Sequence, residues 1–273
     1  MAQAVALSIQ VVSRRSLRVR MSFPGEASAA AAKSAAPPLA PSAASTSTST
    51  STSTSTASSG QPTHFVSLRL ADPELHRAVG TAQAEVVARG GDKRLAACAV
   101  PPEKTHLTAF VMKLEGEGQL ARARAALRGC AALLPPLSSS AEVALPPCLE
   151  LRGVGHFGQR VVYVDCPPSE ERRWLSTFVD GAARTFSEHG IAVQHEPGAW
   201  RAHVTLLKTS RYVGRGRGKP PNIRKAAYEG LEGRDFGRHA LRVLELCSMQ
   251  GEGIDGFYRV EAALPLDGPS RGP

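Results

Sequence analysis

Hydrophobic and polar positions follow a structured pattern only after about residue 62. The segment 63–70 alternates apolar and polar residues, which predicts a strand. A helix is expected from Asp72 to the glycine pair 90–91, because Asp caps the first turn of a helix and glycine ends the last. The segment 105–113 predicts a second strand. The apolar residues that recur at helical spacing between them are Leu75, Val79, Ala82 and Val86.

The same order of elements returns about a hundred residues further along the chain. A strand is expected at 160–165, a helix opens at Ser169 and ends at His189, and a strand follows at 202–208. The repeat predicts two similar α+β lobes that face each other across a cleft. One continuous α+β sheet is the alternative. The buried face of the second helix is expected to comprise Trp174, Phe178, Ala182 and Phe186.

Shorter patterns complete the expected elements. The segment 119–134, rich in Ala, Leu and Arg, predicts a helix, and 222–231 predicts a shorter one. The glycine-rich segment 153–158 predicts a turn between the lobes. Further extended stretches are expected at 143–151 and at 241–249 paired with 257–264.

The composition of the N-terminal part is unlike that of a folded domain. Residues 27–60 are almost only Ala, Ser, Thr and Pro, so they lack the apolar surface that offsets the entropy of ordering a chain. Met1–Phe23 is rich in arginine and has no acid, which is typical of an organelle transit peptide or of a dispensable basic leader. We therefore expect a disordered leader and linker at 1–61, a folded domain at 62–268 and a flexible tail at 269–273.

Charge and cysteine usage narrow the class of protein. The net charge of +9 suits an anionic ligand, although it also fits an ordinary basic surface. The five cysteines are odd in number and widely spaced, which argues against a disulfide framework or a zinc site. No stretch reaches the roughly eighteen apolar residues of a membrane span. We expect a soluble monomer in the cytoplasm, the nucleus or both, with a mitochondrial location as the alternative if the leader is a transit peptide.

The candidate chemistry lies in the two matching strands. They contain His106-Leu-Thr108 and His203-Val-Thr205. Because side chains alternate along a strand, each His and Thr point to one face and the residue between them to the other. One such triplet has little weight in a chain with eight histidines, but two at equivalent positions of a repeat are hard to explain by chance.

These side chains are suited to phosphodiester cleavage. One imidazole can take a proton from the attacking oxygen and the other can protonate the leaving oxygen, since their ordinary pKa values lie near neutrality. The threonine hydroxyls can donate to the non-bridging phosphoryl oxygens. This chemistry requires no metal and no cofactor, and the sequence has no Asp/Glu cluster of the kind that two-metal phosphoesterases use.

Through these motifs the chain resembles the 2H phosphoesterase superfamily of 2′-5′ RNA ligase-like proteins, and within it the A-kinase anchor protein branch. The resemblance implies an α+β, bilobal and pseudo-symmetric fold, with two antiparallel sheets facing a central cleft and helices outside. It also implies activity on 2′,5′-oligoadenylate or on 2′,3′-cyclic or 3′-terminal RNA phosphates. No kinase-anchoring helix is expected in the segment 265–273. The resemblance extends over 62–268 and is carried by 63–68, 105–113, 153–158, 183–190 and 246–249.

Further residues are candidates for contacts with an RNA or nucleotide ligand. Phe157 is the candidate for stacking on a base, and an aromatic residue packed within its loop is the alternative. Lys208, Arg211 and Tyr212 follow the second motif and are candidates for holding flanking nucleotides through phosphate contacts and one stacking ring. A solvated basic loop that continues through Arg215 is the alternative.

Two functions are compatible with these patterns. The first is a metal-independent phosphodiesterase that uses His106, Thr108, His203 and Thr205. The second is a non-catalytic module that binds nucleotides or RNA ends in the same cleft. The presence of both histidines and both threonines favours catalysis.

Overall fold

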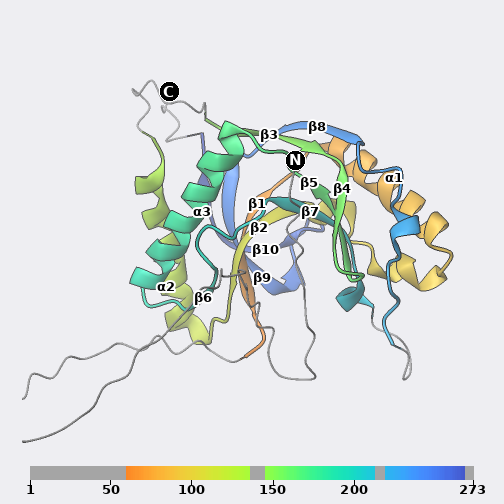
Figure 1. Cartoon of the computed structure of the whole chain (residues 1–273). Helices are drawn as coiled ribbons and strands as arrows, with labels where there is room; N and C mark the ends of the chain where they lie inside the picture. Colours follow the sequence, from red (N-terminus) through yellow and green to blue (C-terminus); the bar gives the residue numbers. More distant parts are fainter. Residues whose placement is uncertain (1–59, 136–144, 213–218, 268–273) are drawn as a thin grey trace, which may run out of the picture. The chain divides into compact units, whose positions relative to one another are not determined.

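Most strands of the domain join in one antiparallel sheet. The computed structural model describes residues 60–135, 145–212 and 219–267 (Figure 1). The leader, most of the linker, the tail 269–273 and Arg215 lie outside these ranges. Along the main sheet the order is β10 (Tyr258–Pro265), β9 (Val243–Glu252), β1 (His64–Arg69), β2 (His106–Met112), β7 (His203–Lys208), β5 (Val161–Asp165) and β4 (Val154–Phe157). The remaining strands are β6 (Val193–Gln194), which pairs with β2, and β3 (Cys148–Arg152) and β8 (Asp235–Ala240), which form a second sheet.

The two histidine motifs lie on neighbouring central strands of the main sheet. Strands β2 and β7 meet at the residue pair Leu107 and Val204. On one side of this junction β2, β1, β9 and β10 form what we call the first half, and on the other β7, β5 and β4 form the second half. The expected α+β class with antiparallel strands in two sheets is confirmed. The halves that carry the motifs are joined in one sheet, and the second sheet is the smaller β3–β8 pair.

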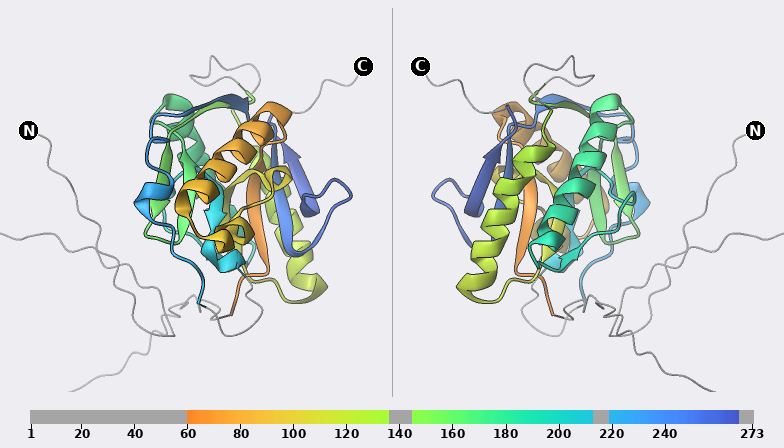
Figure 2. Two further views of the ribbon diagram at one scale, coloured as in Figure 1. Left: turned by 90° about the vertical axis from the view of Figure 1, so that its right-hand side faces the viewer. Right: turned by 90° about the vertical axis from the view of Figure 1, so that its left-hand side faces the viewer.

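The α-helices of the described part are α1 (Pro73–Gly90), α2 (Gly116–Gly129) and α3 (Glu170–Glu188). As expected, Asp72 caps α1 by accepting from the backbone N–H of Glu74 at 2.8 Å, and Gly91 ends it with a φ of 65°. Figure 2 shows α1 on one side of the domain and α2 with α3 on the other. All of them bury apolar residues in one core together with the sheet residues Leu68 and Leu107. The residues that alternate with these lie on the opposite face of the sheet.

The helix expected at 222–231 does not form. The N–H of Ile223 donates to the carbonyl of Gln159 at 2.9 Å, which holds the start of the segment extended. Only a 3-10 turn, Lys225–Ala227, follows. The apolar residues of this segment, which are spaced as in a helix, are buried although the segment is a loop. The tertiary hydrogen bond therefore decided the backbone conformation, and the periodic pattern did not.

Two other expectations are wrong in detail. Trp174 is only partly buried and stacks on Phe178 at 5.2 Å, because the buried face of α3 is centred on Leu175 and Val179. The glycine-rich segment 153–158 forms the edge strand β4 rather than a turn, because its backbone pairs with β5 along the whole strand.

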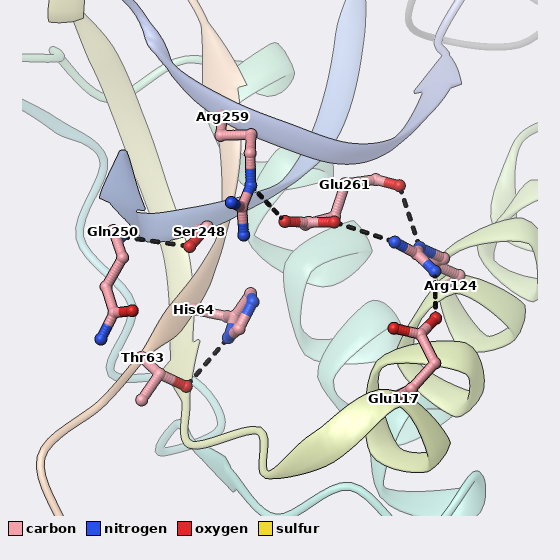
Figure 3. Close-up of polar contacts among 8 residues, drawn as sticks. All are labelled: Thr63, His64, Glu117, Arg124, Ser248, Gln250, Arg259 and Glu261. Atoms are coloured by element: carbon pink, nitrogen blue, oxygen red, sulfur yellow. Dashed lines mark hydrogen bonds and ion pairs between the residues drawn. The ribbon is translucent and has the colours of Figure 1, made fainter. Parts of the chain in front are cut away.

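An ion-pair network fastens α2 to β10 (Figure 3). The largely buried carboxylate of Glu261 accepts from Arg124 at 2.9 Å and from Arg259 at 2.8 Å. Arg124 also donates to Glu117 at 2.7 Å. Because each cation of this network is matched by an acid, the network holds the helix in place and offers no free charge to a ligand.

Two smaller findings concern membranes and thiols. None of the helices within the described ranges is both long and apolar enough to cross a bilayer. All of the cysteines have free thiols, and all except Cys148 are buried, so they serve as small apolar residues, as expected.

Candidate active site

The four motif side chains share the face of the sheet opposite to the apolar core. The central residue of each motif is buried, and these two residues pair with each other where β2 meets β7. The motif side chains on the other face are partly exposed. Because the strands are antiparallel, this register sets His106 beside Thr205 and Thr108 beside His203. The fold therefore brings all four predicted residues together.

A β-bulge follows each motif. Ala109 is skipped in the pairing of β2 with β1, and Leu206 is skipped in the pairing of β7 with β5. A bulge inserts one extra residue, so it reverses the face on which the next residues lie. Lys208 consequently lies on the same face as His203, which regular alternation would not allow. Val111 holds the corresponding position in the first half.

Both imidazoles are held in the same tautomer by the same local bond. Nδ1 of His106 donates to the carbonyl of Lys104 at 2.7 Å, and Nδ1 of His203 donates to the carbonyl of Arg201 at 2.8 Å. A carbonyl oxygen only accepts, so in the neutral rings the proton is on Nδ1 and the lone pair is on Nε2. The hydroxyl of Thr108 donates to Nε2 of His106 at 3.1 Å. Each motif thus presents Nε2 as the nitrogen available for proton transfer.

Aromatic rings enclose His106. The ring centroids of Phe65, Phe257 and Tyr258 lie 5.2, 6.1 and 5.6 Å from the centroid of its imidazole. Phe257 is fully buried and forms a small second core with Phe65 and Cys247. The hairpin between β9 and β10 therefore covers the motif face of the first half.

The same hairpin neutralises the cations next to His106. Arg69 is paired with His106 across β1 and β2, and its guanidinium donates to Asp255 at 2.6 Å. Lys104, which is buried, forms an ion pair with Glu252. Neither cation is free to attract an anionic ligand.

The surroundings of His203 are more open and carry a different charge. The ring of Phe157, on the edge strand β4, lies edge-on to the imidazole at 5.1 Å and stacks on Tyr163 at 4.4 Å. Asp165 is paired with His203 across β5 and β7, and it accepts from Arg201 at 2.9 Å. Phe157 is therefore brought to the site, and the ion pair of Asp165 with Arg201 stands beside this histidine.

Both imidazoles favour the neutral form. Burial, together with the positive charges of His203 and Lys208, lowers the pKa of His106 to about 4. Burial and the positive charges of Arg201 and Lys208 also lower the pKa of His203. The hydrogen bond to the carbonyl of Arg201 and the carboxylate of Asp165 act in the opposite direction. The values near neutrality expected from the sequence therefore do not hold in the free domain, and the two histidines differ in basicity.

The other predicted contact residues divide into two groups. The ammonium of Lys208 is close enough to lower the pKa of both imidazoles. Arg211 instead donates from Nε to the carbonyl of Ala99 at 3.1 Å, and Tyr212 packs against the apolar core. These last two side chains have their contacts away from the histidine pair.

Several neighbours of the histidines were missed at the level of sequence. Tyr163 and Asp165 alternate with buried residues of β5, so strand alternation was a usable signal for their face. Phe257 and Tyr258 come from a hairpin that is distant in sequence from both motifs, and no local signal connects them to His106. Only the strand order shows that they lie together.

The arrangement as a whole suits a phosphodiester. Two imidazoles, two hydroxyls and one ammonium line a single face, which is what proton transfer to and from a charged phosphoryl group requires. Within the described ranges, no group of three or more His, Cys, Asp or Glu side chains is arranged to hold a metal ion.

Fold and site together define a class of protein, the 2H phosphoesterases. Residues 62–266 match the family described as the AKAP7 2′5′ RNA ligase-like domain, and the chain belongs to this family.

Individual proteins similar to the chain include human A-kinase anchor protein 7 isoform gamma, which is 27% identical over 207 residues. The match covers 76% of this chain but only 58% of that relative. Among solved structures, TT0787 of Thermus thermophilus matches with a TM-score of 0.47 and 20% identity, covering 76% of this chain and 98% of its own. E. coli LigT complexed with 3′-AMP matches with a TM-score of 0.42 and 16% identity, covering 75% and 95%.

Proposed function

We propose that the domain is a phosphodiesterase that cleaves RNA-like phosphodiesters without a metal ion. Membership of the 2H phosphoesterases supports phosphodiesterase-type chemistry on RNA-like substrates. The family description names a 2′5′ RNA linkage, which supports 2′,5′-oligoadenylate as a substrate beside 2′,3′-cyclic and 3′-terminal RNA phosphates. The observation that carries the proposal is the pair of imidazoles in one tautomer, each beside a threonine of the other motif on one face of the sheet.

In the proposed mechanism, His106 is the base and His203 is the acid. Nε2 of His106 takes the proton of the attacking hydroxyl or water as that oxygen bonds to phosphorus. The bond from phosphorus to the leaving oxygen breaks, and Nε2–H of His203 protonates that oxygen. Thr108 and Thr205 donate to the non-bridging oxygens and so stabilise the charge that develops there.

The electrostatic difference between the halves supports this division of roles. A base must be neutral before the reaction. Burial lowers the pKa of His106 to about 4, so this ring is already neutral at neutral pH. An acid must carry its proton. The carbonyl of Arg201 and the carboxylate of Asp165 favour the protonated form of His203, whereas burial and the charge of Arg201 oppose it, and the pKa of His203 is lowered less far than that of His106. The negative phosphodiester raises the pKa of both rings when it binds, which brings His203 closer to its working state.

Ligand contacts are proposed for the second half. The partly exposed ring of Phe157, next to His203, stacks on a base of the substrate. Lys208 contacts a phosphate, because the bulge turns it to the same face as the histidines. Arg211 and Tyr212 complete this proposal as contacts for nucleotides beyond that phosphate.

A nucleotide- or RNA-end-binding module that uses the same site is the second candidate. The observation in its favour is that burial lowers the pKa of His203 as well, and a neutral His203 cannot protonate a leaving group at neutral pH. The binding module would bind the same ligands and release no product.

The test is to incubate the purified full chain with 2′,5′-oligoadenylate, a 2′,3′-cyclic nucleotide and an oligouridine with free 3′ ends, and to identify products by mass. We expect cleavage that is unaffected by EDTA and that falls at least about a hundredfold in His106→Ala and in His203→Ala. His189→Ala is the control, because this histidine caps the end of α3 and should keep full activity. Full activity in either motif variant would remove the mechanism, and binding without any product would favour the second candidate.

A further inference from the structure

A groove leads away from the second half of the main sheet. It consists of two adjoining cavities of about 670 and 920 Å³, which share the wall 219–222. The smaller cavity begins at Lys208, whose charge reaches both histidines. The larger one continues to the segment 90–94, directly after α1. The groove therefore begins beside Lys208, which the bulge turns to the face of the histidines, and it ends at a surface that has had no role so far.

The lining of this groove is strongly positive. Its only acid among the described residues, Asp92, is neutralised by Arg94, which donates to both carboxylate oxygens at 2.7–3.1 Å. A concave surface lined by one sign of charge concentrates ions of the opposite sign. The cations along the two cavities are Lys93, Arg94, Arg160, Lys208, Lys219 and Arg224.

The walls of the groove are held by tertiary contacts. The N–H of Ile223 donates to the carbonyl of Gln159 at 2.9 Å, and the guanidinium of Arg94 donates to the carbonyl of Lys219 at 3.2 Å. Pro221, within the wall, and Ile223, next to it, are buried. Because the shape is set before any ligand arrives, binding there does not require a large loss of conformational entropy.

The cavity that adjoins the first half is less positive than the groove. It has a volume of about 610 Å³, begins at Arg69, and combines three arginines with the carboxylates of Asp72 and Glu245. Beside His106, Arg69 is paired with Asp255, and Lys104 is paired with Glu252. At the position that corresponds to Lys208, the first half has Val111, packed under the hairpin cover. A negatively charged chain bound at the histidines is therefore attracted more strongly towards the second half.

We infer that the groove binds the phosphate backbone of a single-stranded oligonucleotide whose reacting phosphodiester lies at the histidines. This inference rests on the proposed function, and it narrows the substrate class to oligonucleotides of several nucleotides rather than mononucleotides or cyclic nucleotides. A narrow basic channel follows a single strand, whereas a duplex requires a broad basic face. Because no aromatic side chain lines either cavity in the described ranges, contacts with phosphates dominate and binding is largely independent of base sequence.

The test measures affinity as a function of oligonucleotide length. The probes are AMP and fluorescent 2′-O-methyl oligoadenylates of two to eight nucleotides, which lack the 2′-hydroxyl nucleophile. Full-length wild type is compared with Lys219→Glu/Arg224→Glu in the groove. The matched control is Arg122→Glu/Arg184→Glu, which makes the same change of net charge on exposed positions of α2 and α3, away from α1 (Figure 1). Anisotropy is recorded at several salt concentrations.

We expect wild type to bind the octamer more tightly than the dimer. In the groove variant the ratio of octamer affinity to AMP affinity should fall at least about tenfold, and the slope of log affinity against log salt should fall by roughly 0.7 for each cation lost. The control should keep both values. Equal affinity for dimer and octamer, or an equal loss in the control, would overturn the inference.

The two proposals fail in different ways. If wild type forms no product and does not bind AMP, while the groove variant still loses octamer affinity, the proposed function is wrong and oligonucleotide binding in the groove is retained. If cleavage proceeds normally but affinity is independent of oligonucleotide length, oligonucleotide binding in the groove is wrong and the proposed function is retained.

Discussion

The two halves of the main sheet share their motif geometry and differ in what surrounds it. Each half has a strand with His-x-Thr, a bulge after the threonine and a bond from Nδ1 to the carbonyl two residues earlier. In the first half a hairpin covers the face and its acids neutralise the cations. In the second half Phe157 and Arg201 lie over the buried ring of Tyr163, and the residue paired with the histidine is Asp165 instead of Arg69. The repeated backbone positions the imidazoles, and the unrepeated loops make them chemically different.

The largest expected effect concerns the hairpin cover. Phe257→Ala should lower the free energy of unfolding by about 3–5 kcal/mol, because a fully buried ring leaves a cavity in the small second core. Phe157→Ala, its counterpart near His203, should cost much less, because that ring is partly exposed on an edge strand. Urea unfolding at neutral pH measures both. Equal losses would mean that the two halves are covered to the same extent.

The next effect is on stability as a function of pH. Because the pKa of His106 is lowered to about 4 in the folded domain, the unfolded chain takes up this proton first as the pH falls below about 6.5. Folding stability should therefore decrease by roughly 2 kcal/mol from this group between about pH 7 and about pH 4.5. Urea unfolding of His106→Gln should lack that part of the decrease. His203→Gln should remove less of it, and a reversed order would contradict the difference between the halves.

A smaller effect is expected at Lys208. Lys208→Ala should raise KM about tenfold, as expected for loss of one charged contact with phosphate. It should also move the pH profile upwards, because the ammonium lowers the pKa of both imidazoles. Lys225→Ala, another exposed lysine, is the control. An unchanged KM together with an unchanged pH profile would show that Lys208 does not contact the substrate or influence the histidines.

The smallest effect should sharpen the division of roles. Asp165→Asn removes a carboxylate that favours the protonated form of His203, so the alkaline limb of kcat/KM should move to lower pH. The acid limb, which reports the base, should stay in place. The profile of kcat/KM measures this, because it reports the free enzyme. Movement of the acid limb instead would exchange the roles of the two histidines.

Sequence patterns that act within a few residues predicted the structure correctly, and segments whose structure depends on distant residues were predicted wrongly. Asp72 and Gly91 bound α1 as predicted, since capping is decided within a few residues. The helix expected at 222–231 is wrong because its first residues are bonded to Gln159, which no local window contains. Placement of the four motif residues on one face followed from strand alternation and duplication. The face on which Lys208 lies could not be predicted in this way, because a bulge can be recognised only from the pairing of two strands.

The sequence by itself determined the duplicated strand–helix–strand order, the caps of the first helix and the identity of the two motifs, because each depends on spacing along the chain. The tertiary structure alone decided which rings surround each imidazole, which charge stands beside it and where the basic groove runs. Burial and electrostatic interaction depend on distance in space, and the hairpin that covers His106 and the carboxylate beside His203 come from separate regions of the chain. The imidazoles of the two motifs therefore differ in pKa.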